Sequence, residues 1–287
     1  MFAVSTNQKI KMFSSTGIPI REIKESHIDS FLFTPNENFV VSWSNDTIKI
    51  WNVGTCKCVK EIKNDDVIYS LDINSEGTKV ATGENGKCKV WDINTGEILN
   101  IFHLANRFYR VNFVSFSPDG NKILLPSTID KNEVSIYDLN TNRFIHSFND
   151  DYSRVHSASF SPNGSSIAIC FENSCKVFNS VTYKEIFNLS KYDTIPFYST
   201  FNKDGTILCV LFNNNNIVLY NTTTGQIFNE INTRHHVKYM TFDSNNNILV
   251  SQYDSTVTLY NFYTSEELFI LNDDLMSCNK ICVQGLI

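Results

Sequence analysis

The sequence predicts an all-β fold built from repeated four-stranded units. Three observations support this prediction. Short stretches alternate apolar and polar residues, which is typical of half-buried strands. Turn sequences rich in Pro, Asp, Asn and Gly separate these stretches. Both features recur at intervals of about 40 residues, and no stretch shows a clear helical periodicity.

The clearest copy of the repeat runs from Gly86 to Gly96. It contains a predicted strand, Cys88 to Asp92, bounded by turn residues on both sides. An aromatic residue recurs at the place of Trp91, usually followed by Asp or Asn: Phe13, Trp51, Trp91, Tyr137, Phe178, Tyr220 and Tyr260. A spacing of about 40 residues with this signature indicates the blades of a β-propeller.

A second landmark is a turn that ends one strand of each copy. Its best example is Phe116-Ser117-Pro118-Asp119-Gly120, where Pro restricts φ and Gly accepts a positive φ. Related turns follow Phe33, Ile73, Phe160, Phe201 and Phe242. We therefore predict a hairpin at each of these positions.

With these aromatic and turn sequences, the chain resembles the WD40-repeat family. The resemblance implies a seven-bladed β-propeller of four-stranded antiparallel blades, with strands a to d in each. In the third blade these are expected at 67–73, 79–84, 88–92 and 97–103, and in the fourth at 111–116, 122–127, 134–138 and 143–148. The Gly-His pair of the family is missing, and Asp46 and Trp51, with Ser42 or Ser44, are the nearest remnant of its buried polar set.

The two ends of the chain are expected to share a blade. The chain opens on Phe2 to Ser5, which has the pattern of a strand b with no strand a before it. One further step of the turn spacing from Phe242 falls on Val283. We therefore expect Cys278 to Val283 to supply the innermost strand of blade one and close the ring. This predicts a single propeller domain over residues 1–287, with no appended domain.

Composition limits the classes of function. A net charge of −6 provides no general attraction for nucleic acid or anionic lipid. The N-terminus lacks the pattern of a signal peptide, and no apolar run is long enough for a transmembrane helix. The eight cysteines lack metal-ligand spacing and are expected to be buried thiols rather than disulfides. We expect a cytoplasmic protein, with a nuclear location as the alternative, that has no cofactor and no metal.

The candidate binding residues lie in the loops that lead from strand d to the next strand a. The resemblance places these loops on the top face of the propeller, around the mouth of its channel. Four consecutive blades carry basic and aromatic residues there: Arg107, Phe108, Tyr109, Arg110, Tyr152, Arg154, Tyr192, Arg234, His235 and His236. Arg and Tyr are frequent in interface hot spots, so these residues form a candidate site for a protein partner.

Other interpretations of these loops remain open. Phe108 and Tyr239 could fill gaps between blades, and Arg154 could pair with Asp150 or Asp151. Acidic pairs at 65–66, 150–151 and 273–274 suit either a cation site or solvated turns. The loop from Thr128 to Glu133 could extend the candidate site.

The resemblance implies a non-catalytic scaffold or adaptor. We expect its partner to be a protein or peptide with carboxylates or phosphates, and the chain to be a monomeric subunit of a larger complex. One alternative is a propeller hydrolase resembling a lactonase, for which His235 and His236 are the candidate groups. Another is a ribonucleoprotein component that binds RNA through the local basic residues.

Overall fold

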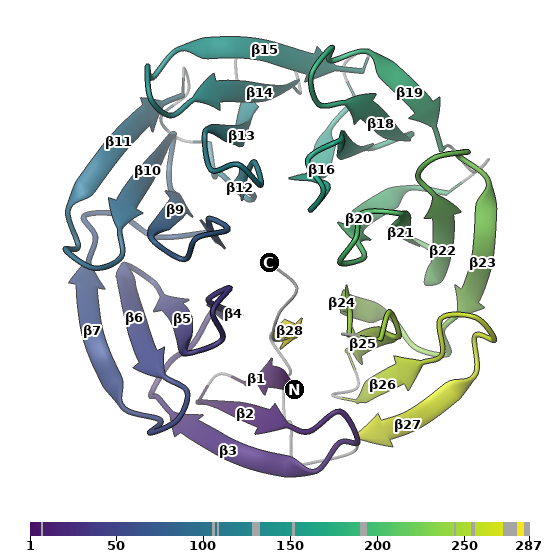
Figure 1. Cartoon of the computed structure of the whole chain (residues 1–287), viewed down its shortest axis with the longest axis horizontal. Coiled ribbons are helices and arrows are strands. Elements are labelled where there is room, and N and C mark those ends of the chain that lie inside the picture. Colours follow the sequence, from purple (N-terminus) through teal and green to yellow (C-terminus); the bar gives the residue numbers. More distant parts are fainter. Residues whose placement is uncertain are drawn as a thin grey trace. The chain divides into compact units, whose positions relative to one another are not determined.

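The structure is a computed structural model that describes residues 1–6, 8–104, 107, 109–127, 133–150, 153–189, 194–243, 245–253, 256–271 and 280–283. These residues form β-strands, turns and loops (Figure 1). None of the described residues lies in a helix that could cross a membrane.

The strands form seven four-stranded sheets, each of which is one blade, so the predicted seven-bladed β-propeller class is confirmed. Contacts within the chain divide it into two compact units. The first comprises Met1–Asp65, Asn215–Val218 and Phe228–Ile287, and the second comprises Asp66–Asn214 and Leu219–Ile227. The prediction of a single domain over residues 1–287 remains a prediction.

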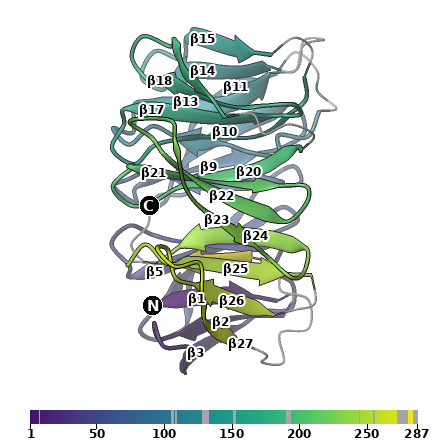
Figure 2. The same ribbon diagram turned by 90° about the vertical axis from the view of Figure 1, so that its right-hand side faces the viewer.

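The first unit contains three complete sheets. One has the order β28-β1-β2-β3, formed by Lys280–Val283, Phe2–Ser5, Lys9–Phe13 and Pro19–Lys24. The next has the order β4-β5-β6-β7, formed by Ser30–Phe33, Phe39–Ser44, Thr47–Asn52 and Cys58–Lys63. The third has the order β24-β25-β26-β27, formed by Val237–Phe242, Ile248–Gln252, Val257–Tyr260 and Glu267–Leu271. Figure 2 shows the strands of this third sheet lying side by side.

The two ends of the chain pair within this unit, as predicted. Strand β28 lies antiparallel to β1, with Phe2 opposite Val283 and Ser5 opposite Lys280 (Figure 1). It also contacts β4 and β24, which belong to the two neighbouring sheets. This arrangement is consistent with the predicted closure of the ring by the C-terminal strand. The strand begins at Lys280, and Cys278 lies outside the described residues.

The second unit contains three complete sheets and most of a fourth. The first consists of β8 (Ser70–Ile73), β9 (Lys79–Gly83), β10 (Lys87–Asp92) and β11 (Ile98–His103). The second consists of β12 (Ser115–Phe116), β13 (Lys122–Ser127), β14 (Glu133–Asp138) and β15 (Phe144–Asn149). The third consists of β16 (Val155–Phe160), β17 (Ser166–Phe171), β18 (Cys175–Asn179) and β19 (Glu185–Asn188). The fourth consists of β20 (Pro196–Phe201), β21 (Ile207–Phe212), β22 (Asn216–Asn221) and β23 (Ile227–Asn232). In each sheet the strands lie in chain order.

The predicted strand a of the fourth blade was too long. The expected range began at Val111, whereas β12 contains only Ser115 and Phe116. The reason is that the preceding backbone pairs with the third blade instead: the Val111 amide donates to the Glu84 carbonyl at 3.0 Å, and Arg110 forms a bridge with Asn85. Strand β8 likewise begins at Ser70 rather than Val67. The other expected strand ends in these two blades differ from the structure by at most a residue.

The predicted turns are confirmed in their backbone. In the turn after Phe116, Gly120 has a φ of 67° and its amide donates to the Ser117 carbonyl at 2.8 Å. The residue at the same place of the other five turns also has a positive φ: Glu37, Gly77, Gly164, Gly205 and Asn246. Each turn thus supplies the left-handed residue that its hairpin requires.

Part of the expected buried polar set is present. The Trp51 indole nitrogen donates to the Ser42 hydroxyl at 2.8 Å, and Trp91 makes the same bond to Thr82 at 3.0 Å. Asp46 does not join them, because its carboxylate lies 2.8 Å from the Thr47 hydroxyl and 3.4 Å from the Lys63 amine. In these two blades, one indole bond therefore ties strand c to strand b inside the sheet.

Candidate functional site

The predicted binding residues of the second unit precede successive edge strands. Strands β8, β12, β16 and β20 are the first strands of their sheets, and each contacts the next. The loops that precede these four strands therefore lead into a continuous row of neighbouring strands. Arg107, Tyr109, Arg110 and Arg154 lie in these loops, whereas Phe108, Tyr152 and Tyr192 fall outside the described residues.

Arg110 is held on a well-defined backbone. The Tyr109 carbonyl accepts a hydrogen bond from the Gly86 amide at 2.6 Å, and the adjacent bridge with Asn85 fixes the chain direction. The Arg110 side chain is exposed, and its guanidinium lies over the Tyr69 ring at 5.0 Å. Arg107 is exposed and Tyr109 is half-buried. A cation stacked on an aromatic ring is pre-positioned to bind an anion.

Arg154 lies at the start of the next blade, beside a cluster that the sequence did not reveal. It is exposed and immediately precedes β16. Two residues later, the half-buried His156 ring meets the Phe197 ring edge-on at 5.3 Å. Burial lowers the pKa of His156, the Arg154 charge lowers it further, and Glu172 opposes them. Phe197 is 45% exposed, so the His156–Phe197 pair presents an aromatic surface to solvent.

His156 and Phe197 were missed because both strands are bulged. The register shifts between Val155 and Ser157 in β16, and between Pro196 and Tyr198 in β20. A bulge breaks the alternation from which the facing of a side chain is predicted. The only available signal was an aromatic pair directly after Pro196.

The remaining predicted residues lie in the first unit. Arg234 is exposed, and its Nε lies 3.6 Å from a carboxylate oxygen of Glu267. His235 and His236 are also exposed, and His236 Nδ1 lies 3.0 Å from the Asn215 side-chain oxygen. The ten predicted residues are therefore divided between the two units.

The acidic loop residues have structural partners. Asp150 accepts hydrogen bonds from the Lys176 amine and the Ser174 hydroxyl, both at 2.7 Å. Asp66 accepts one from the Asn85 amide at 2.9 Å and lies 3.9 Å from the Lys87 amine. The interpretation of these two residues as merely solvated was wrong, and Asp150 pairs with Lys176 rather than with Arg154. Asp151, Asp273, Asp274 and the loop residues 128–132 lie outside the described residues.

The described residues contain no group of three His, Cys, Asp or Glu side chains that could hold a metal ion. They contain no disulfide either, and Cys88, Cys170, Cys175, Cys209 and Cys282 are buried as predicted. Cys56 and Cys58 differ from that prediction. Cys56, in the loop before β7, is half-buried, and Cys58, the first residue of β7, is exposed.

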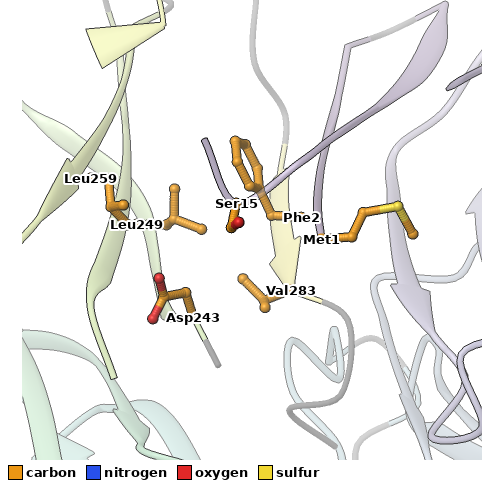
Figure 3. Close-up of a pocket in the computed structure, with 7 residues that line it drawn as sticks. All are labelled: Met1, Phe2, Ser15, Asp243, Leu249, Leu259 and Val283. Atoms are coloured by element: carbon orange, nitrogen blue, oxygen red, sulfur yellow. The ribbon is translucent and has the colours of Figure 1, made fainter. Parts of the chain in front are cut away.

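A small recess lies in the first unit, beside the paired ends of the chain. It is lined by Met1, Phe2, Ser15, Asp243, Leu249, Leu259 and Val283 (Figure 3). Its only carboxylate, Asp243, already accepts hydrogen bonds from the Asn245 and Asn247 amides at 2.8 and 2.7 Å. The recess has room for about one water molecule.

Comparison with known proteins agrees with this fold. Residues 56–92 match the family model described as WD domain, G-beta repeat. A protein of Acanthamoeba polyphaga mimivirus, named for a BTB/POZ domain and WD repeats, is 31% identical over 122 residues, which cover 36% of this chain and 23% of the relative. The WD repeat-containing protein 89 homolog of Dictyostelium discoideum is 27% identical over 141 residues, which cover 48% and 38%.

A third relative matches a longer part of the chain. The Arabidopsis thaliana protein named transcriptional corepressor LEUNIG_HOMOLOG is 25% identical over 208 residues, which cover 68% of this chain and 25% of the relative. The chain therefore matches less than half the length of each of these three relatives.

Proposed function

This chain belongs to the WD40-repeat family, and on that premise we propose that it is a non-catalytic scaffold that binds a protein partner. The relatives with WD repeats support a role in protein interaction. The finer proposal is that the partner presents carboxylates or phosphates to Arg107, Arg110 and Arg154. No observation among the described residues favours the hydrolase or the RNA-binding alternative.

One observation carries this proposal. Exposed arginines precede the neighbouring edge strands β12 and β16: the Arg110 guanidinium lies over the Tyr69 ring, and Arg154 is two residues from His156, whose ring meets Phe197. An arginine fork can bind a carboxylate or phosphate with two parallel hydrogen bonds, while Tyr69 and Phe197 supply apolar contact. At Arg110 the bridge with Asn85 already fixes the backbone, so little conformational entropy is lost there on binding.

The test is a pull-down that compares three baits: the wild type, Arg107→Glu/Arg110→Glu/Arg154→Glu, and a control with the same change in charge. The control is Arg143→Glu/Lys184→Glu/Lys203→Glu, because these residues are also exposed in the second unit but lie in other loops. All three baits must first show the same melting temperature.

We expect a stoichiometric partner to be lost from the first variant and retained by the control. Equal recovery by all three baits would show that these arginines do not bind the partner. Loss from both variants would indicate a general effect of charge and would also reject this site.

A further inference from the structure

Two buried cysteines face each other across one hairpin of the second unit. Cys170 in β17 is directly opposite Cys175 in β18, and their sulfur atoms lie 3.6 Å apart. Both side chains are completely buried. In the described part of the chain, no other pair of neighbouring strands places two cysteines opposite each other.

The backbone of this hairpin suits a bond between the two sulfurs. The Phe171 amide donates to the Ser174 carbonyl at 2.7 Å, so this neighbouring pair is the hydrogen-bonded one. Pair types alternate along an antiparallel ladder, which makes Cys170 and Cys175 a non-hydrogen-bonded pair with Cα atoms about 4.5 Å apart. Disulfides span Cα distances of about 4.4 to 6.8 Å, so the bond can form with only a small movement of the sulfurs.

The third blade shows how specific this pair is. Cys88 in β10 occupies the same place as Cys175, but its partner in β9 is Gly83. A side chain at Gly83 would collide with the Ser70 hydroxyl and with the backbone at Val111. In the blade with two cysteines, Cys170 takes the place of Gly83. Ser157 is opposite Cys170 just as Ser70 is opposite Gly83, and the sheet leaves room for the Cys170 thiol. The third blade therefore has one thiol, Cys88, at the place where this hairpin has two, and Cys88 serves as an internal control.

We propose that Cys170 and Cys175 are an oxidative modification site that forms an intrachain disulfide when the protein meets a hydroperoxide. The hydroperoxide is the two-electron oxidant, and the hairpin supplies both thiols. The pair lies directly behind the exposed turn residues Glu172 and Asn173, so opening of this short turn gives a small oxidant access.

The surroundings favour Cys170 as the thiol that reacts first. The buried Ser157 and Ser199 hydroxyls have no hydrogen-bond acceptor of their own and can donate to a thiolate at Cys170. Burial raises the pKa of Cys170, but donation from Cys175, Ser199 and Ser157 to its thiolate form outweighs burial and lowers the pKa. The pKa of Cys175 is raised by its bond to Cys170 and by burial.

The reaction balances in two steps. The Cys170 thiolate attacks one oxygen of hydrogen peroxide, the O–O bond breaks, and the hydroxide that leaves takes up the thiol proton as water, which gives a sulfenic acid. The Cys175 sulfur then attacks the Cys170 sulfur, the S–O bond breaks, and hydroxide leaves with the Cys175 proton as a second water. Two thiols and one peroxide thus yield one disulfide and two waters.

The test treats the reduced full-length chain with hydrogen peroxide, blocks the remaining thiols after denaturation, and maps them by mass spectrometry. We expect the peptide with Cys170 and Cys175 to lose two alkylatable thiols and two hydrogens, and to regain both thiols on reduction. Cys88 should remain alkylatable under the same treatment. Retention of both thiols at peroxide doses that oxidise the exposed Cys58 would overturn the proposal.

Two variants make the test independent of a change in folding. In Cys175→Ser the second step is blocked, so a sulfenic acid should accumulate at Cys170 and react with dimedone. In Cys88→Ser the disulfide should form as in the wild type. A Cys170 that goes only to sulfinic acid in the wild type would also contradict the proposal, because it would show that Cys175 does not resolve the intermediate.

Discussion

Among single residues, Glu84 is a carboxylate that depends strongly on its neighbours. Its side chain is completely buried, and Oε2 lies 3.4 Å from the Lys89 amine and 3.3 Å from the Lys87 amine. The Thr82 hydroxyl donates to Oε1 at 3.1 Å. Burial raises the pKa of Glu84, and the two lysines only partly offset this effect. The group therefore depends on its partners to remain charged.

Lys89→Met should destabilise the protein by about 3 kcal/mol, because it leaves a buried carboxylate with less compensation. The double variant Lys89→Met/Glu84→Gln should lose less than the sum of the two single changes. Urea unfolding of the four proteins gives the coupling free energy. Strictly additive losses would show that the two groups do not stabilise each other.

Asp150 gives a prediction about pH. Burial raises its pKa, but the hydrogen bonds from Lys176 and Ser174 are stronger in sum and lower it below the ordinary 3.8. A carboxyl whose pKa is lower in the folded state adds stability above pH 3.8, and this stability is lost as the pH falls through the folded pKa. Its pairing thus matters most near neutral pH.

Asp150→Asn should therefore lower the free energy of unfolding by about 1 kcal/mol at neutral pH, a value reduced for solvent screening. The difference from the wild type should shrink progressively in acid below pH 3.8. Denaturant unfolding at several pH values checks this. A difference that stays constant with pH would mean that the charge of Asp150 is not involved.

At the scale of the strand and the turn, regular patterns were predictable and irregular ones were not. The aromatic strands and the positive-φ turns followed from alternation and from local turn residues such as Pro118 and Gly120. The short β12 did not, because its preceding backbone bonds to Glu84 and Asn85 in another sheet. Such long-range pairing leaves no local signal in the sequence.

Gly83 tests how closely the backbone at Val111 approaches the sheet of the third blade. Gly83→Ala should destabilise the protein by about 1 to 3 kcal/mol, because a Cβ would meet the Ser70 hydroxyl and the Val111 backbone. Gly54→Ala is a suitable control, since its Cβ would meet only the Asn52 side chain at 3.4 Å. Thermal unfolding of both variants gives the comparison. Equal melting temperatures would mean that Ser70 and the Val111 backbone lie less close to Gly83 than described.

At the scale of the whole molecule, the number of blades and the pairing of the chain ends could be predicted, but the site only in part. Repeat spacing fixes both fold features, because every blade needs four strands and the N-terminal blade lacks one. The positions of Arg110 and Arg154 followed from the same spacing. Their neighbours did not: Tyr69 comes from the preceding blade, and His156 and Phe197 meet across two bulged strands.

The propeller assignment depends most directly on the pairing of the two chain ends. In that pairing Ala3 is opposite Cys282, and Val4 is opposite Ile281. Ala3→Cys therefore places two thiols on the same face of neighbouring strands, whereas Val4→Cys places the new thiol on the other face.

The decisive measurement is the mass-spectrometric yield of a short thiol crosslink between residues 3 and 282 in the folded protein. The described pairing predicts efficient crosslinking in Ala3→Cys, little in Val4→Cys, and none when Cys282 is also replaced by Ala. Failure of Ala3→Cys to crosslink, or an equal yield from Val4→Cys, would contradict the pairing and with it the closure of the first blade by the last strand.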